Sequence, residues 1–152
     1  MFISHAHLDH IGGLSDFLNK NKQVNVYVPV SFRGVLKAKK VVHVDQSIEI
    51  YENFYSTGEL ENIEQSLAVK TNKGMVIIVG CSHPKMKKIL DAASQFGKVY
   101  AIVGGLHGFD DYELFEDLDF ICPTHCTRHI AEIKALYPEK YIEGGAGKVI
   151  NL

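Results

Sequence analysis

The sequence is poor in cysteine, has no long apolar run and carries no excess of charge of either sign. Three cysteines, Cys81, Cys122 and Cys126, lack the even number and spacing of a disulfide framework, which favours a reducing compartment. A net charge of −2 with scattered Lys and Arg argues against nucleic acid or an acidic membrane as the partner. No apolar run approaches the ~18 residues of a membrane span, and no signal-like segment opens the sequence, so we expect a cytoplasmic protein.

The sequence has enough apolar residues for one core. Its first half is rich in strand patterns, and its second half alternates strand and helix patterns. With 152 residues and 46% hydrophobic content, we expect a single domain over residues 1–152. Short apolar runs after Phe2-Ile3 predict strands over 24–30, 41–45, 48–58, 66–71, 75–80, 99–105, 119–126 and 148–152. Helical patterns cover 12–19, 31–40, 84–97, 110–118 and 128–138. The strands of the second half alternate with helices, which indicates an α/β layered domain.

Two local signals sharpen this outline. The turn "TNKG" at 71–74 lies between two strand patterns and predicts a hairpin. The helix pattern at 31–40 contains Gly34, which weakens it. In the helix expected over 12–19, the apolar stripe is Leu14, Phe17 and Leu18.

Histidine is the unusual residue, and the segment "HAHLDH" holds three of the eight. His5 and His7 are two apart, so in an extended segment their side chains share one face and can hold one cation. Asp9 and His10 follow where the chain turns into a helix, and they can reach a second position. Imidazole and carboxylate ligands suit zinc, iron or manganese, so the segment predicts part of a metal site.

Further ligands must come from elsewhere, and three histidines follow buried strand patterns directly. They are His83 in "VGCSHP", His107 in "VGGLHGF" and His125 in "CPTHCT". Because the carboxyl ends of parallel strands converge on one crevice, we expect these histidines near the first segment. A hydrogen-bonded loop residue is an equally good interpretation of His107.

Several residues favour a plainer interpretation. His43 fits a half-exposed strand residue, and His129 fits a helix-surface residue or a hydrogen-bond donor to a ligand. Cys81 and Cys122 adjoin apolar runs and fit small core residues. A structural Cys/His zinc site around Cys122, His125 and Cys126 is a rival, although no C-x-x-C pair is present.

The order of these motifs resembles one protein family. "SHAHLDHIGGL" resembles the H-x-H-x-D-H signature of the metallo-β-lactamase superfamily. The segments "FYSTGEL", "EQSLAVKTNKGMVIIVGCSHP", "VGGLHGFD" and "CPTHCT" are similar to its branch of 7,8-dihydropterin-6-yl-methyl-4-(β-D-ribofuranosyl)aminobenzene 5′-phosphate synthase-like hydrolases. The resemblance covers nearly the whole sequence and implies an αββα sandwich with a two-metal centre at one sheet edge.

The resemblance also implies roles for individual residues. His5, His7 and His83 would hold the first metal, and Asp9, His10 and His125 the second. His107 would contact substrate or the surroundings of a ligand. The implied cofactors are two divalent metal ions, with zinc preferred over manganese or iron, and the implied partner is a small-molecule substrate.

The sequence departs from the family pattern in two ways. Lys85 and Arg128 stand where related chains have glycine, which changes the expected pocket. The usual N-terminal strands do not precede the motif, so we expect an MBL-fold domain without them. An uncovered edge of this kind favours a homo-oligomer or a partner that covers it.

Three functional hypotheses follow. In the first, metal-activated water attacks an ester, lactone or phosphoester, with Asp9 as the catalytic carboxylate, or the metals assist a pterin-related synthase reaction. Lys85, Lys87, Lys88 and Arg128 would meet phosphate there, unless they are solvated helix residues. In the second, a shortened chain binds metal without catalysis. In the third, zinc is purely structural, and its removal unfolds the protein.

Overall fold

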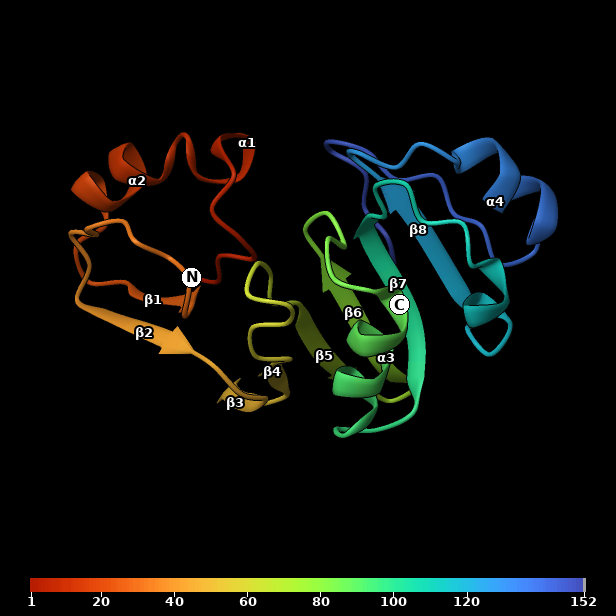
Figure 1. The fold of residues 1–152 in the computed structure, drawn as a ribbon, viewed down its shortest axis with the longest axis horizontal. Coiled ribbons are helices and arrows are strands. Elements are labelled where there is room, and N and C mark those ends of the chain that lie inside the picture. The colour runs from red at the N-terminus through yellow and green to blue at the C-terminus, as the bar shows by residue number, and fades with distance from the viewer. Residues whose placement is uncertain (152) are drawn as a thin grey trace.

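A computed structural model describes residues 1–151 and shows two β-sheets with helices packed on them (Figure 1). The first sheet is small and lies in the N-terminal part of the chain. Its strands β1 (Asn25–Pro29) and β2 (Lys40–Val44) are parallel. Phe2 pairs with Tyr27 of β1, so the first residues extend this sheet on the other edge of β1.

A helix covers the small sheet. Helix α2 (Leu14–Lys20) buries Leu14 and Leu18 against Val26 and Val28 of β1. The helix expected over 12–19 is therefore confirmed, with one difference. Phe17 points outward and is 43% exposed, because the seven-residue helix buries only one narrow face.

The second sheet has six strands in the order in which they occur along the chain. They are β3 (Ile48–Tyr51), β4 (Phe54–Ser56), β5 (Leu67–Thr71), β6 (Gly74–Val79), β7 (Val99–Gly105) and β8 (Phe120–Thr124). Neighbours from β3 to β6 are antiparallel, and β6, β7 and β8 are parallel. The hairpin expected at 71–74 is the β5–β6 turn.

Strand β6 shows why the sequences of the parallel strands are continuous apolar runs. Met75, Ile77 and Val79 face one apolar cluster, while Val76 faces another on the opposite side of the sheet. Parallel strands covered on both faces show this pattern rather than strict alternation. The strands expected over 75–80, 99–105 and 119–126 are all present. The strand β7 has the expected bounds, β6 is shifted by one residue, and β8 is shorter by one residue at its start and two at its end.

Three helical segments cover the larger apolar cluster. They are α3 (Met86–Ser94), the 3-10 turn η1 (Tyr112–Phe115) and α4 (Ile130–Leu136). They contribute Met86, Ile89, Phe115 and Ile133 to the cluster. The α/β layered arrangement expected from the sequence is confirmed.

The structure corrects three expected elements. Residues 31–39 form no helix, because Phe32 packs into the core of the small sheet and Gly34 disfavours helix. Residues 48–58 form two strands joined by a turn at Asn53, which has a positive φ of 63°, rather than one strand. Residues 148–151 form no strand, since Tyr141 takes the place beside Ile121 of β8, and residue 152 lies outside the described residues.

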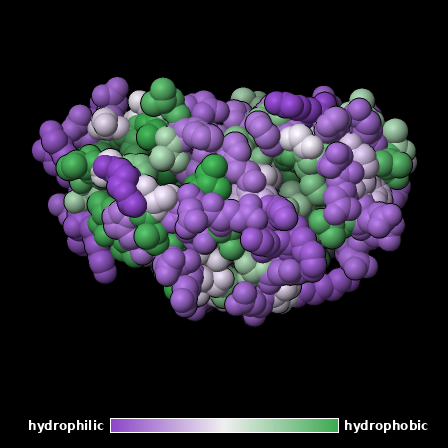
Figure 2. All heavy atoms as spheres, in the orientation of Figure 1, coloured by the Kyte–Doolittle hydropathy of each residue, from purple (hydrophilic) through white to green (hydrophobic). Residues whose placement is uncertain are grey.

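The sheet directions bring one set of loops together. The carboxyl ends of β6, β7 and β8 lie at one edge of the large sheet, and α1 (Leu8–Ile11) lies across from that edge (Figure 1). Hydrophilic side chains cover most of the face in Figure 2, with apolar patches near α1 and around the small sheet. Among residues 1–151, no helix has the length and apolar character needed to cross a membrane.

Candidate metal centre

His5 is the most deeply buried histidine of the N-terminal segment. Its ring is fully buried, and its Nδ1 lies 3.0 Å from Ser4 Oγ and 3.9 Å from Glu64 Oε2. Its Nε2 is also buried and has no hydrogen-bond partner among residues 1–151. An unsatisfied buried nitrogen is costly, so this atom is a candidate ligand atom for a cation.

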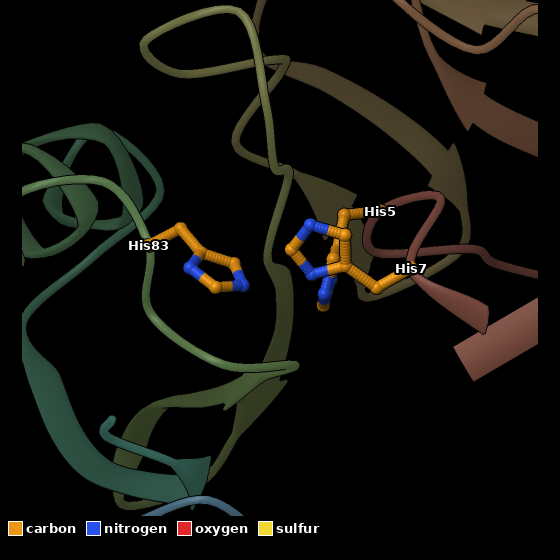
Figure 3. A group of neighbouring side chains, drawn as sticks. All are labelled: His5, His7 and His83. Atoms are coloured by element: carbon orange, nitrogen blue, oxygen red, sulfur yellow. The ribbon is translucent and has the colours of Figure 1, made fainter. Parts of the chain in front are cut away.

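His83 approaches the same position from the large sheet. It follows β6, and its ring centroid lies 4.9 Å from that of His5 and 4.8 Å from that of His7. Its Nε2 is the second buried nitrogen of the site without a partner in the described chain. Figure 3 shows the three rings turned toward one another, and their donor atoms lie within 4.8 Å of each other.

Asp9, His10 and His125 form a second group beside the first. Helix α1 carries Asp9 and His10, and His125 follows β8. Asp9 Oδ2 lies 3.0 Å from His125 Nε2 and 3.6 Å from His10 Nε2. The three donor atoms lie within 4.8 Å of one another, on the more exposed side of the site.

The two groups are adjacent. The His5 and His10 ring centroids are 4.1 Å apart, and those of His10 and His125 are 4.9 Å apart. All six residues expected as ligands therefore gather at one place, in the two sets of three that the sequence resemblance implies. The donor atoms of each set lie close enough together to contact one cation.

The loops that carry the histidines share an unusual backbone conformation. Ser82, His107 and His125 have positive φ values of 57°, 47° and 51°. These values fall in the left-handed region, which residues other than glycine seldom adopt. Each of the three parallel strands is thus followed by a sharp turn near the site. Backbone strain of this kind is often found at functional sites.

A buried carboxylate holds the loop of His83 in place. Glu64 is fully buried, and its Oε1 accepts hydrogen bonds from the backbone N–H groups of Gly80 and Cys81, both at 2.9 Å. A longer bond of 3.3 Å comes from Ser82, and Oε2 accepts one of 3.0 Å from His83. Several N–H donors on one carboxylate satisfy its charge without a cationic side chain.

Gln65 performs a related task for the N-terminal segment. Its side-chain Nε2 donates to the backbone oxygen of Ile3 at 2.9 Å, and its backbone N–H donates to that of Ser4. Ser56 Oγ in turn donates to Gln65 Oε1 at 2.7 Å. Sequence reasoning missed both Glu64 and Gln65, and the only available signal was two polar residues placed directly before an apolar strand.

The structure separates the cysteines. Cys122 packs with Val76, Ala101 and Phe120, as expected for a core residue. Cys81 is also buried, yet its Sγ lies 3.2 Å from His10 Nε2, so it belongs to the site as well as to the interior. The interpretation of Cys81 as a simple core residue is therefore incomplete. Burial raises the pKa of both thiols, and Cys126, Glu64 and Asp9 add to the effect at Cys81.

The electrostatics favour the neutral form of the His5 and His83 imidazoles and the charged form of the exposed Asp9 carboxylate. The pKa of His5 is lowered to about 4, chiefly by burial and also by the neighbouring His10 and His83 rings, against the opposing effect of Glu64. Burial likewise lowers the pKa of His83. Desolvation raises the pKa of Asp9, but a hydrogen bond with its own backbone and the rings of His10 and His125 bring it below its usual value. Neutral imidazole and ionised carboxylate are the forms that bind metal.

The remaining candidates lie outside the two groups. The exposed ring of His107 lies beside His83, with centroids 5.2 Å apart, which places it next to the site. His43 is exposed on β2, and His129 lies 3.4 Å from Glu132 at the start of α4, as the plainer interpretations expect. Lys87 pairs with Asp91, and Lys88 pairs with Glu61.

Comparison with known structures identifies the fold. A crystal structure of a metal-dependent hydrolase of the β-lactamase superfamily superposes with a TM-score of 0.78 over 99% of this chain and 78% of that one, at 23% sequence identity. The chain therefore has the metallo-β-lactamase-like fold expected from its motifs. No family model matches the sequence.

Two proteins of Methanocaldococcus jannaschii are similar in sequence. One is a 7,8-dihydropterin-6-methyl-4-(β-D-ribofuranosyl)-aminobenzene-5′-phosphate synthase, 34% identical over an alignment that covers 60% of this chain and 37% of that protein. The other is an uncharacterised protein, 24% identical over 99% of this chain and 77% of its own length. The alignment with the synthase thus spans little more than a third of that relative. The expected similarity to this branch is confirmed at that level.

Proposed function

We propose that this protein is a metal-dependent hydrolase whose two groups of donor side chains hold two divalent cations, zinc in preference to manganese or iron. The observation that carries the proposal is the pair of buried nitrogens, His5 Nε2 and His83 Nε2, which lack partners within residues 1–151 and belong to one group of donors. A cation satisfies both nitrogens at once, whereas a protein hydrogen bond to either would need a donor or acceptor between them.

The donor set fits the metals proposed. His5, His7 and His83 would hold the first ion, and Asp9, His10 and His125 the second. Ser4 and Glu64 lie near His5 Nδ1, which leaves Nε2 as its free ligand atom. Bound together, two divalent cations supply Lewis acidity and make water nucleophilic near neutral pH.

The protein's own groups then position the reactants. Asp9 is ionised at neutral pH and exposed, so its carboxylate can accept a hydrogen bond from an attacking water and orient it. The exposed position of His107 beside His83 supports a role for it in contacting a substrate that enters from the solvent side. The substrate is a small ester, lactone or phosphoester, or a pterin-related phosphate of the kind named for the similar synthase.

The test combines metal content with activity. We expect two equivalents of zinc per chain by elemental analysis, and turnover of a chromogenic phosphodiester or lactone. Asp9→Ala should lower kcat by about 100-fold or more, since a positioned base contributes at least that much. His43→Ala, which changes an exposed histidine on β2, is the matched control and should retain activity.

Two results would count against this proposal, the first against the role of Asp9 and the second against catalysis. Unchanged activity in Asp9→Ala would refute the role given to that carboxylate. Two bound metals without turnover of either substrate class would favour the alternative, in which the chain is a metal-binding but inactive subunit.

We also propose that the protein associates with a second copy of itself. An apolar groove of about 540 Å³ runs between the first residues and the β3–β4 hairpin. It is lined by Met1, Phe2, Asn25, Tyr27, Ile50, Tyr51, Phe54 and Leu67. Tyr51 is 72% exposed and Phe54 38%, which is unusual for large side chains on one surface and typical of a contact region.

Light scattering tests this association. The protein should have the mass of a dimer, and Tyr51→Ser should shift it toward the monomer while leaving the circular dichroism spectrum unchanged. A monomeric mass for the unmodified protein at high concentration would contradict the proposal.

A further inference from the structure

Two thiols lie beside the nitrogen donors of the candidate centre. Cys81 follows β6, two residues before His83, and Cys126 directly follows His125. The donor atoms of Cys81, His125 and Cys126 lie within 4.8 Å of one another. Those of His5, His10 and Cys81 satisfy the same limit, so the Cys81 sulfur is shared between two groups of donors.

The contacts of Cys81 are specific. Its Sγ lies 3.2 Å from His10 Nε2, the same nitrogen that lies 3.6 Å from Asp9 Oδ2. Its backbone N–H is fixed by Glu64 at 2.9 Å, which limits how far the thiol can move. The sulfur is therefore held against a proposed ligand, rather than only against aliphatic side chains.

A glycine on β7 makes room for this arrangement. A Cβ atom at Gly105 would lie 2.8 Å from Cys126 Sγ and 3.2 Å from Cys81 Cα. The Gly80 carbonyl oxygen would be closer still, at 2.5 Å, so any larger residue would displace the end of β6 or the Cys126 thiol. The end of β7 thus packs closely against the Cys126 thiol and the backbone of Cys81.

The unpartnered nitrogen that supports the proposed function also lies in a donor group with Cys81. His5 Nε2 is fully buried and has no hydrogen-bond partner in the described chain. His5 and Cys81 belong to one group of donors with His10. A nitrogen without a partner and a sulfur in the same group are together what a mixed-ligand metal site offers.

We propose that Cys81 is a sulfur ligand of the metal centre, on the side of His10 and His125. The inference rests on the function proposed above and adds a ligand to its site. When the sulfur–metal bond forms, the S–H bond breaks and its proton passes to solvent, so no atom changes oxidation state. Thiolate is a soft ligand, so its participation selects zinc, cobalt or iron over manganese and magnesium.

Cobalt substitution tests the assignment. Cobalt(II) is loaded into the metal-free protein, its content is measured, and the near-ultraviolet absorption is recorded. A sulfur-to-cobalt charge-transfer band should appear in the unmodified protein and be lost in Cys81→Ser. Cys122→Ser, which changes a buried cysteine in an apolar cluster, is the matched control and should keep the band.

The outcomes separate this inference from the proposed function. A protein that holds two cobalt ions per chain without the band, or a Cys81→Ser variant that keeps it, overturns the sulfur ligand and leaves the metal centre standing. A protein that takes up neither cobalt nor zinc overturns both.

A second measurement removes the dependence on the variant's folding. X-ray absorption of the zinc-loaded, unmodified protein should show a sulfur neighbour at ~2.3 Å. A spectrum fitted by nitrogen and oxygen neighbours alone would overturn the inference.

Discussion

At the scale of single residues, the site depends on one buried carboxylate that binds no metal in our proposal. Glu64 accepts backbone hydrogen bonds from four consecutive residues, Gly80 to His83, and lies 3.9 Å from His5 Nδ1. It therefore fixes the loop that delivers His83 and also faces the ring of His5. Glu64 is a positioning residue that acts on both halves of the first group.

Replacing this carboxylate tests its role. Glu64→Gln puts an amide NH₂ where an acceptor is needed, so we expect a loss of about 2–3 kcal/mol in the free energy of unfolding. Zinc affinity, measured by calorimetry, should fall as well, because His83 loses its fixed position. Glu52→Gln, at an exposed position, is the control and should change neither quantity. Unchanged zinc affinity in Glu64→Gln would contradict the positioning role.

The buried imidazoles predict a pH dependence for the metal-free protein. The pKa of His5 in the fold is about 4, below the ordinary value near 6.5, so the unfolded chain binds more protons between these two values. Stability is therefore fully present above pH 6.5 and declines as the pH falls toward 4, at a slope of up to ~1.4 kcal/mol per pH unit for one group. The lowered pKa of His83 acts in the same direction.

Urea unfolding of the metal-free protein at pH 7, 6 and 5 measures this decline. His5→Gln removes the titrating ring and should flatten the profile. A profile that stays equally steep in that variant would assign the pH dependence to other groups.

Much of the grouping of donor side chains could be predicted at this scale, because candidate metal ligands are chemically distinctive and cluster in the sequence. His5, His7, Asp9 and His10 lie within six residues, and His83 and His125 follow recognisable strands. The role of Glu64 could not be predicted, because its partners are backbone N–H groups, which every residue type except proline carries. Cys81 was given too small a role because a buried cysteine beside an apolar run fits a core equally well.

At the scale of elements, the parallel strands β6, β7 and β8 position the site. Their carboxyl ends are adjacent, and each continues into a tight loop toward the N-terminal segment. The end of β6 passes close to that segment at Gly80. A Cβ atom there would lie 2.4 Å from Ser4 Oγ and 2.9 Å from Glu64 Oε1.

This close approach predicts a steric effect. Gly80→Ala should reduce the free energy of unfolding by about 1–3 kcal/mol, because Ser4 and Glu64 must both move. Thermal or urea unfolding measures the loss. Gly145→Ala, at a position with nothing within 4 Å of the added carbon, should be close to neutral. Equal stability of the two variants would show that Ser4 and Glu64 can move away from the added carbon without loss of stability.

Elements were predictable where the pattern was long or bounded by a turn. The β5–β6 hairpin and α3 belong to this class, since "TNKG" marks the turn and an apolar stripe marks the helix. The segment 31–39 was not, because the burial of Phe32 and a hydrogen bond from the Ser31 N–H to Glu59 override its local helical pattern. Residues 148–151 were not, because Tyr141 pairs beside β8.

At the scale of the whole molecule, three apolar clusters hold the described part of the fold, and none contains a proposed metal ligand. The largest lies between the large sheet and α3, η1 and α4, a small one lies on the opposite face of that sheet, and the third lies under α2 on the small sheet. The site lies between these cores, at the loops rather than within them. We therefore expect the fold to form without metal, and metal binding to increase its stability.

Metal removal tests this expectation. Treatment with a chelator should leave the far-ultraviolet circular dichroism spectrum nearly unchanged while it lowers Tm, because binding adds stability only by mass action. Loss of the spectrum on chelation would contradict a catalytic centre in a preformed fold and favour the structural zinc hypothesis. Restored Tm on addition of zinc is the control for reversibility.

The general architecture was predictable from the alternation of strands and helices in the second half of the sequence. The relation between the two sheets was not, because it depends on Gln65 reaching Ile3 across 62 positions of the chain. Contacts of that range carry no local pattern.

The distance along the chain between Asp9 and His125 has a consequence for synthesis. These two groups are 116 residues apart yet lie 3.0 Å from one another. During translation, the segment with Asp9 leaves the ribosome long before His125 is synthesised, and contacts between residues so far apart in sequence form late in folding. The nascent polypeptide therefore has no complete pocket with which to capture an ion, and metal loading becomes a sign that the last strand has docked.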